Sequence, residues 1–204
     1  MSTHTVLREV SLRLREILLA GLAGDPDVGA DFQGMNAISL ASPATVANQG
    51  GPDDRPALSL YLYQVTPSGY LRNQPLLASG PDEQRHPPLP VDVRYLITPS
   101  GAVASDDLVI LGRVIQTLEA NTILRAAFLE SDLDRQLRGA RLSFEPLPLE
   151  DLVRIWSAFN EPYRLSVAYI VRGVLIDSLR VPEAGVPVRE SLVDVRQLAA
   201  EPST

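Results

Sequence analysis

The chain has 204 residues, of which 45% are hydrophobic and 21% are charged, as in an ordinary folded domain. Its 25 acidic and 18 basic residues give a net charge of −7, which opposes sequence-independent binding to the phosphate backbone of nucleic acids. The lack of cysteine excludes disulfides, thiolate metal sites and cysteine nucleophiles. All 18 basic residues are arginine, so mechanisms that depend on lysine are excluded as well.

No stretch of the sequence approaches the roughly 20 consecutive apolar residues that a transmembrane helix needs. Arginine and glutamate interrupt the apolar residues near the N-terminus, which is unlike the continuous apolar core of a signal peptide. We therefore expect a protein that is assembled in the cytoplasm, without a signal peptide and without direct insertion into a membrane.

The first half of the chain predicts one helix and three strands. Apolar residues recur at helical spacing over residues 5–22, and a short strand is expected at residues 37–41. Alternation with a period of two predicts strands at residues 57–66 and 91–97. The connection between these two strands, residues 68–90, contains five prolines. Connections of this length inside a compact domain are usually functional or mobile.

The second half begins with a predicted helix that extends to about residue 120. Ser105 is expected to cap its start, and Asp106 and Asp107 to stabilise the positive end of its dipole. A second helical piece is expected at residues 122–129. The residues of the first helix that are expected to face inward are Leu108, Leu111, Ile115 and Leu118.

The following patterns alternate between strand and helix. Residues 140–145 predict a strand, and residues 149–160 predict a helix. Residues 163–171 alternate again, and residues 174–178 continue extended after Gly173, which favours a β-bulge. The residues of the helix that are expected to face inward are Leu149, Leu152, Ile155, Trp156 and Phe159.

The order of these elements predicts the fold class. Strands and helices are interleaved without regular βαβ units, so we expect an α/β protein of the α+β type. Its sheet is mixed and largely antiparallel, and about three to four helices pack against it in a single domain, residues 1–180. The proline-containing segment 181–204, with a weak helical pattern at residues 191–200, is interpreted as an assembly arm.

The search for chemical motifs is negative. Nucleophile-elbow, phosphate-loop, dinucleotide-binding and zinc-helix motifs are absent. Only His4 and His86 could act as an imidazole base, and His4 lies at the terminus. The acidic residues before His86 could suggest a metal site, but flanking prolines prevent a helix from aligning Asp82 with His86. We expect no catalytic residue, no metal, no cofactor and no small-molecule substrate.

The aromatic residues also favour a structural interpretation. Tyr61, Tyr63 and Tyr70 could form a stacking platform for bases or sugars. Aromatic residues on the second face of a strand are more often packed under a helix, which is the interpretation preferred here. Trp156, at helical spacing between Ile155 and Phe159, is expected to be a core residue.

Several segments together carry a resemblance to a known family. The chain resembles the tail-terminator or cap family of phage-tail-like contractile injection systems, and the resemblance covers roughly residues 58–178. The predicted helix at residues 5–22 stands in the place of that family's opening helix. The segments are L-S-L-Y-L-Y-Q-V at 58–65, L-R-N at 71–73, P-P-L-P-V-D-V-R-Y-L-I-T at 87–98, L-x-x-L-G-x-V-I-x-x-L at 108–118, L-x-x-L-x-x-I-W-S-A-F at 149–159 and P-Y-R-L-S-V-A-Y-x-V at 162–171.

The resemblance implies a structural function. Proteins of this family form a ring, typically hexameric, on the last layer of the inner tube and sheath. The ring ends polymerisation and fixes the length of the particle, and the family has no catalytic residues to transfer to this sequence. The implied partners are other copies of this chain and the tube and sheath proteins, with no nucleic acid.

The contact residues expected in such a ring come from the long connection. Arg72 suits a bidentate pair with a carboxylate, and Asn73 suits hydrogen bonds to backbone groups, although a plain turn role before Pro75 is an alternative. Arg85 and His86 are further candidates for a protein interface. We expect residues 68–90 and 181–204 to supply part of the two non-equivalent surfaces that a closed ring needs.

Two other function classes stay open from the sequence. The chain could be an adaptor that links such a particle to an effector or a membrane factor without forming a ring. It could also be a hydrolase-like enzyme that uses His86.

Overall fold

The structure is a computed structural model, and it describes residues 3–48, 57–69, 77–78, 83–100, 104–124, 140–180 and 183–184. The chain folds as two compact units. The first unit comprises Met1–Gln74 and Pro88–Ser178, and the second comprises Pro75–Pro87 and Leu179–Thr204. No helix of the described residues is long and apolar enough to cross a membrane.

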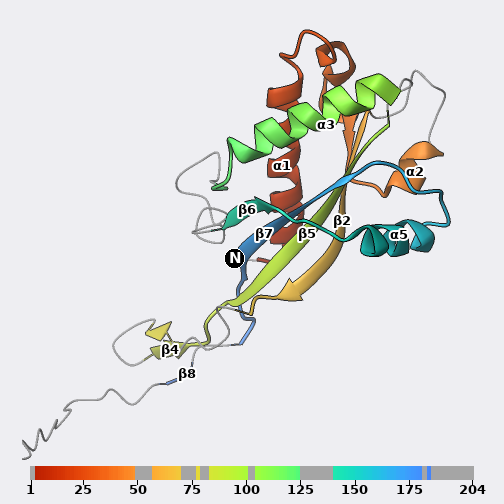
Figure 1. Cartoon of the computed structure of the whole chain (residues 1–204). Coiled ribbons are helices and arrows are strands. Elements are labelled where there is room, and N and C mark those ends of the chain that lie inside the picture. Colours follow the sequence, from red (N-terminus) through yellow and green to blue (C-terminus); the bar gives the residue numbers. More distant parts are fainter. Residues whose placement is uncertain are drawn as a thin grey trace, which may run out of the picture. The chain divides into compact units, whose positions relative to one another are not determined.

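The first unit is built on a five-stranded sheet with the strand order β1-β2-β5-β7-β6 (Figure 1). Only β1 and β2 are parallel, and every other neighbouring pair is antiparallel. The sheet and the four helices described below confirm the predicted α+β class with a mixed, largely antiparallel sheet. The strands are β1 (Ile38–Ser39), β2 (Leu58–Pro67), β5 (Leu89–Pro99), β6 (Arg141–Phe144) and β7 (Val167–Ile176).

Two β-bulges flank the central strand β5. In β2, Tyr63 is an extra residue, because Leu62 pairs with Tyr95 while Gln64 pairs with the adjacent Arg94. In β7, the extra residue lies at Gly173, which has φ 79°, a conformation that glycine adopts without steric cost. The Gly173 N–H donates to the Asp92 carboxylate at 3.2 Å. The bulge that the sequence favoured at Gly173 is therefore confirmed.

Helix α1 (Val6–Leu22) forms the centre of the core. Its predicted apolar stripe is buried against the face of the sheet that carries Val93, Tyr95 and Ile97. The Tyr95 hydroxyl lies 2.9 Å from the Ser11 hydroxyl, and Ser11 also donates to the Leu7 oxygen at 2.8 Å, so both hydroxyl groups at this contact are satisfied. The buried residues of the stripe are Val6, Val10, Leu14, Leu18 and Leu22.

Helix α3 (Ala104–Glu119) packs across α1 and shares its core. It begins one residue before Ser105, so Ser105 lies in the first turn and its hydroxyl donates to Asp106 Oδ1 at 3.1 Å. The predicted inward face was partly wrong, since Leu108 is 60% exposed. Leu111 and Leu118 are buried as predicted. The other buried residues of the helix are Ile110 and Val114 in place of Leu108 and Ile115.

The helix predicted at residues 122–129 is not formed at its start. Ile123 makes a β-bridge with Arg141, and the Leu142 N–H donates to the Thr122 oxygen at 2.8 Å. The segment after α3 thus extends the sheet beside β6, and Leu124 is buried there. Residues 125–139 lie outside the described residues.

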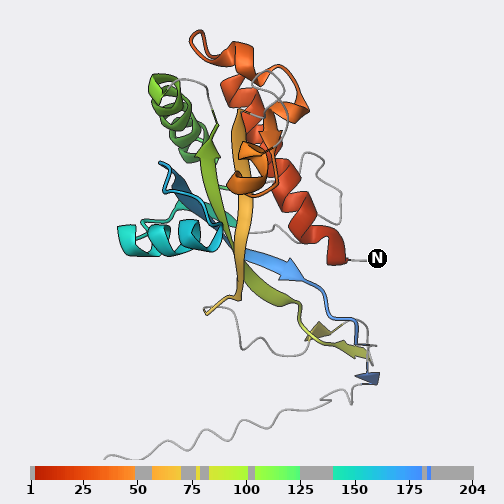
Figure 2. The ribbon, with the colours of Figure 1, turned by 90° about the vertical axis from the view of Figure 1, so that its right-hand side faces the viewer.

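Helix α5 (Leu149–Ala158) lies on the face of the sheet opposite α1 (Figure 2). Its Trp156 is buried, and its Nε1 donates to the Ser166 hydroxyl at 3.2 Å. Phe159 meets the ring of Tyr61 edge to face at 5.5 Å. The predicted core role of Trp156 and the packing of Tyr61 under a helix are confirmed, but Leu149, expected inward, is 63% exposed.

A short helix was not predicted from the sequence. Helix α2 (Pro43–Ala47) starts with Ser42 as its N-cap, whose hydroxyl accepts the Thr45 N–H at 3.2 Å. Pro43 occupies the first helical position, where its missing N–H costs nothing. Three 3₁₀ turns complete the described helices, at Thr3–Thr5, Gly29–Phe32 and Met35–Ala37.

The second unit contains a small antiparallel sheet with the order β3-β4-β8. Its strands are β3 (Leu77–Ala78), β4 (Glu83–Arg85) and β8 (Glu183–Ala184). The C-terminal segment therefore pairs with the long connection between β2 and β5 within this unit. The domain boundary predicted at residue 180 stays a prediction.

The crossing of α1 and α3 gives the first testable prediction. A methyl group added at Gly21 would overlap the side chain of Thr117, whereas one added at Gly112 on α3 would meet nothing within 4 Å. Both glycines lie within helices, so alanine improves helix propensity at both. We expect Gly21→Ala to lower the free energy of unfolding by about 1–3 kcal/mol. Gly112→Ala should raise it by about 0.5–1 kcal/mol.

Urea unfolding followed by circular dichroism measures both changes. If Gly21→Ala proved as stable as Gly112→Ala, the close approach of the two helices would be wrong. Thr117→Ala in the Gly21→Ala background should recover part of the loss, because it removes two of the three overlapping atoms.

Candidate functional site

The four residues predicted for an interface are only partly described. Arg72 and Asn73 lie outside the described residues. Arg85 is the last residue of β4, where it pairs with Leu77 of β3. His86 follows directly, and its Nε2 lies 3.5 Å from Nη1 of Arg180.

The two segments that were expected to supply contact surfaces are joined in the structure. Strand β8 of the C-terminal segment pairs with β4 of the long connection, through Glu183 with Gln84 and Ala184 with Glu83. Nothing in the sequence spacing indicated this pairing. The segments therefore act as one structural unit, and a change in one is expected to affect the other.

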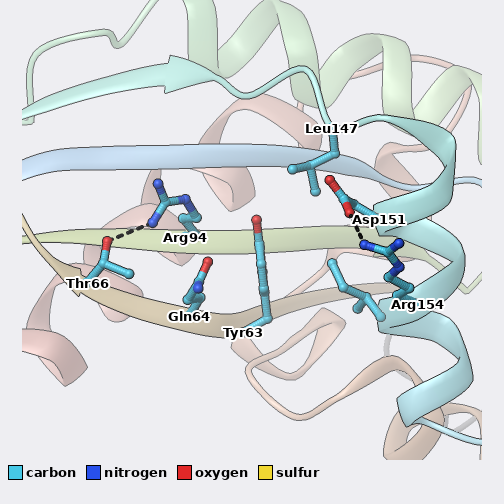
Figure 3. Close-up of a pocket in the computed structure, with 8 residues that line it drawn as sticks. Tyr63, Gln64, Thr66, Arg94, Leu147, Asp151 and Arg154 are labelled. Carbon is cyan, nitrogen blue, oxygen red and sulfur yellow. Dashed lines mark hydrogen bonds and ion pairs between the residues drawn. The ribbon is translucent and has the colours of Figure 1, made fainter.

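A polar cluster that the sequence analysis missed lies on the α5 side of the large sheet (Figure 3). The Arg94 Nε donates to Glu145 Oε1 at 2.8 Å, and its Nη1 donates to the Thr66 hydroxyl at 2.8 Å. The Tyr63 hydroxyl donates to the second carboxylate oxygen of Glu145 at 3.3 Å. One carboxylate thus ties together β2, β5 and the segment between β6 and α5.

The ion pair in this cluster is well shielded from solvent. The side chains of Arg94 and Glu145 are 22% and 16% exposed. Burial is the main factor that raises the pKa of Tyr63, and the neighbouring Glu145 carboxylate raises it further because it opposes a second negative charge. Tyr63 therefore stays protonated and donates to Glu145 throughout the physiological pH range.

The cluster borders a half-open cavity of about 460 Å³. Asp151 and Arg154 of α5 stand at its rim and pair with each other at 3.2 Å. The cavity has no histidine, serine or cysteine in its lining, and its two arginines are matched by two carboxylates. The residues that line it are Tyr63, Gln64, Thr66, Arg94, Leu147, Asp151, Arg154 and Ile155.

The lining holds two hydroxyl groups, and both are engaged: that of Tyr63 donates to Glu145, and that of Thr66 accepts from Arg94. The described residues also contain no group of three histidine, cysteine or acidic side chains that could hold a metal ion. The cluster fixes the start of α5 to the sheet.

Several large apolar side chains remain exposed in the first unit. Leu149 and Val153 lie one turn apart on α5 and are 63% and 44% exposed. Exposed apolar residues at such spacing are typical of surfaces that another protein covers. Others in the first unit with at least 40% exposure are Met35, Val65, Leu89, Leu108, Val109, Ile123, Phe144, Tyr163 and Leu165.

One signal in the sequence could have revealed the polar cluster. Arg94 interrupts a strand in which Val93, Tyr95, Leu96 and Ile97 are all apolar. An arginine at the centre of a sheet requires a carboxylate partner when it is shielded from water. The identity of that partner, Glu145, could not be predicted, because 51 positions separate the two residues.

A comparison with known protein families shows which family the chain belongs to. The sequence matches the Pvc16 N-terminal domain family over residues 9–190. The chain belongs to this family. The resemblance to tail terminators noted in the sequence is thereby confirmed.

Solved structures support the fold of this Pvc16 N-terminal domain. The sheath/tube terminator of an extracellular contractile injection system, PVC, in its extended state is similar with a TM-score of 0.56 and 20% identity. The match covers 92% of this chain and 64% of the terminator, so the chain spans less than two thirds of that protein.

A second solved structure is less similar. The tube terminating cap of the anti-feeding prophage is matched with a TM-score of 0.46 and 24% identity, over 67% of this chain and 48% of the cap. No curated protein sequence matches the chain.

The shielded ion pair gives the second prediction. Removal of either partner leaves the other charge poorly solvated, so a double-mutant cycle of Arg94→Met and Glu145→Gln should give a coupling energy of about 1–3 kcal/mol. The exposed pair Asp151 and Arg154 is the control, since it also joins an arginine to a carboxylate but lies at the surface. Its coupling should be below about 0.5 kcal/mol.

Urea unfolding of the single and double variants measures both couplings. Equal coupling in the two pairs would contradict the assignment of the Arg94–Glu145 pair as the contact that fixes α5 to the sheet.

Proposed function

We propose that this chain is a structural terminator of a contractile injection system. It forms a ring, expected to be a homohexamer, on the end of the inner tube and sheath, ends polymerisation and fixes the particle's length. The observation that carries the proposal is the match to the Pvc16 N-terminal domain family over residues 9–190. The likeness in fold to a sheath/tube terminator over 92% of the chain supports it.

The physical properties of the chain fit this role. A closed ring uses two different surfaces of each subunit. The first unit offers exposed apolar side chains, and the second unit offers a small sheet in which β3 and β8 are edge strands. Paired strands at the outside of a small sheet can accept further strands from a neighbour.

The partners follow from the proposal. They are other copies of this chain and the tube and sheath proteins, and assembly is expected in the cytoplasm. No enzymatic activity, cofactor or small-molecule substrate is proposed. The adaptor alternative has no observation in its favour.

The second unit provides the third prediction. The Ser68 N–H donates to the Pro90 oxygen at 2.9 Å, so the two ends of the long connection already meet. Replacement of residues 70–87 by a short glycine-containing turn should therefore leave the first unit folded. We expect this variant to be a monomer that forms no rings and does not decorate tube ends, as measured by light scattering and negative-stain microscopy.

Truncation after Ser178 is the companion variant, because it removes β8 and leaves β4. Both variants should keep the circular dichroism spectrum expected for the first unit and lose ring formation. If both still form rings with the same number of subunits as the parent protein, the long connection and the C-terminal segment are not part of the ring contacts.

A further inference from the structure

The outer edge of β2 is covered by β1 only at its start. Strand β1 pairs with Leu58 and Ser59, whereas β2 continues to Pro67. Among the described residues, no strand pairs with this edge beyond Ser59. In Figure 2, which looks onto this edge, no described helix or strand crosses in front of the lower half of β2.

The hydrogen bonds at the two ends of β2 show which of its backbone groups point away from β5. The Ala57 oxygen accepts the Ser100 N–H at 2.8 Å, so alternation turns the backbone groups of Leu60 and Leu62 away from β5. Beyond the bulge, the Ser68 N–H donates to Pro90, which turns Val65 and Pro67 outward. Strand β1 engages the Leu60 N–H through its parallel pairing with Leu58 and Ser59, so the outward N–H groups beyond β1 are those of Leu62 and Val65.

The end of this edge is set by Pro67. Proline lacks an N–H, and in a sheet it is tolerated where the missing donor would have faced away from the neighbouring strand. The usable edge beyond β1 therefore runs from residue 61 to residue 65, a length of five residues. Val65 is 40% exposed, so an added strand would also cover an apolar side chain.

An open edge of this length can pair with strands of other chains. Such pairing promotes aggregation of a free monomer, but it can hold the subunits of an assembly together. Pairing through the backbone places few demands on side chains, so it can persist between relatives of low identity. We propose that in the ring this edge of β2 is paired by the C-terminal segment, residues 185–204, of a neighbouring copy. This inference rests on the proposed function.

The choice of this occupant follows from the length and pattern of the C-terminal segment. In extended form, residues 185–204 reach roughly 66 Å, which exceeds the width of a domain of this size. Residues 191–196 read Ser-Leu-Val-Asp-Val-Arg, a stretch long enough to cover the open edge. Val193 and Val195 alternate with Asp194 and Arg196, so this part of the weakly helical stretch also has the pattern of a half-buried strand.

The first test isolates a single backbone N–H. Val65→Pro removes an outward donor and leaves the hydrogen bonds to β5 in place, whereas Val65→Ala shortens the same side chain and keeps the donor. We expect Val65→Pro to weaken each subunit contact about tenfold. In light scattering, its rings should dissociate at protein concentrations at which the rings of the parent protein are still intact. Val65→Ala should form rings at concentrations close to those of the parent protein.

The second test identifies the occupant and does not depend on the proline variant being folded. The chain has no cysteine, so any disulfide must form between introduced residues. A Val65→Cys protein is mixed with proteins that carry Ser191→Cys, Val193→Cys or Val195→Cys, and the mixture is oxidised. We expect a disulfide-linked dimer between the two different proteins for at least one of the three positions.

The outcomes distinguish a failure of the strand pairing from a failure of the proposed terminator function. Rings without any cross-link between the two different proteins would overturn the pairing and leave the terminator function intact. If a strand of the sheath protein takes this edge instead, the isolated rings give no cross-link, which also overturns it. A preparation that forms neither rings nor tube-end caps would overturn the pairing and the proposed function together.

Discussion

The double-sided pairing of β5 is the constraint on which the rest of the structure depends. From Val91 to Ile97 it pairs with β2 on one side and β7 on the other, so its side chains there must alternate between two environments. One face packs under α1, and the other carries Arg94 and packs toward α5. The bulges on both neighbours lie beside residues 91–95 of this strand.

This constraint explains which parts of the fold the sequence could predict. Alternation was strong in β2 and β5, and α1 had a single apolar stripe, so these elements were predicted close to their observed bounds. The inward face of α3 could not be predicted, because its residues 108–111 are all apolar and the close contact between Gly21 and Thr117 decides the rotation. The candidate site depended on distant contacts, Arg94 with Glu145 and β4 with β8, which spacing does not reveal.

The same constraint relates the fold to the proposed role. Because β5 is satisfied on both sides, the sheet can grow only at its edges, and β2 offers an edge that β1 leaves largely uncovered. The shielded Arg94–Glu145 pair fixes α5 to the sheet, which keeps the apolar residues Leu149 and Val153 in place at the surface. A rigid body with open edges is suited to binding the end of a polymer rather than to chemistry at a cavity.

The most direct test of the account is the length of the particles. Tube and sheath proteins of the same system are produced with and without this chain, and particle lengths are measured by negative-stain microscopy. The account predicts one narrow length distribution, with a ring at one end, when the chain is present, and a broad distribution with overlong tubes when it is absent. Identical distributions in the two preparations would contradict it.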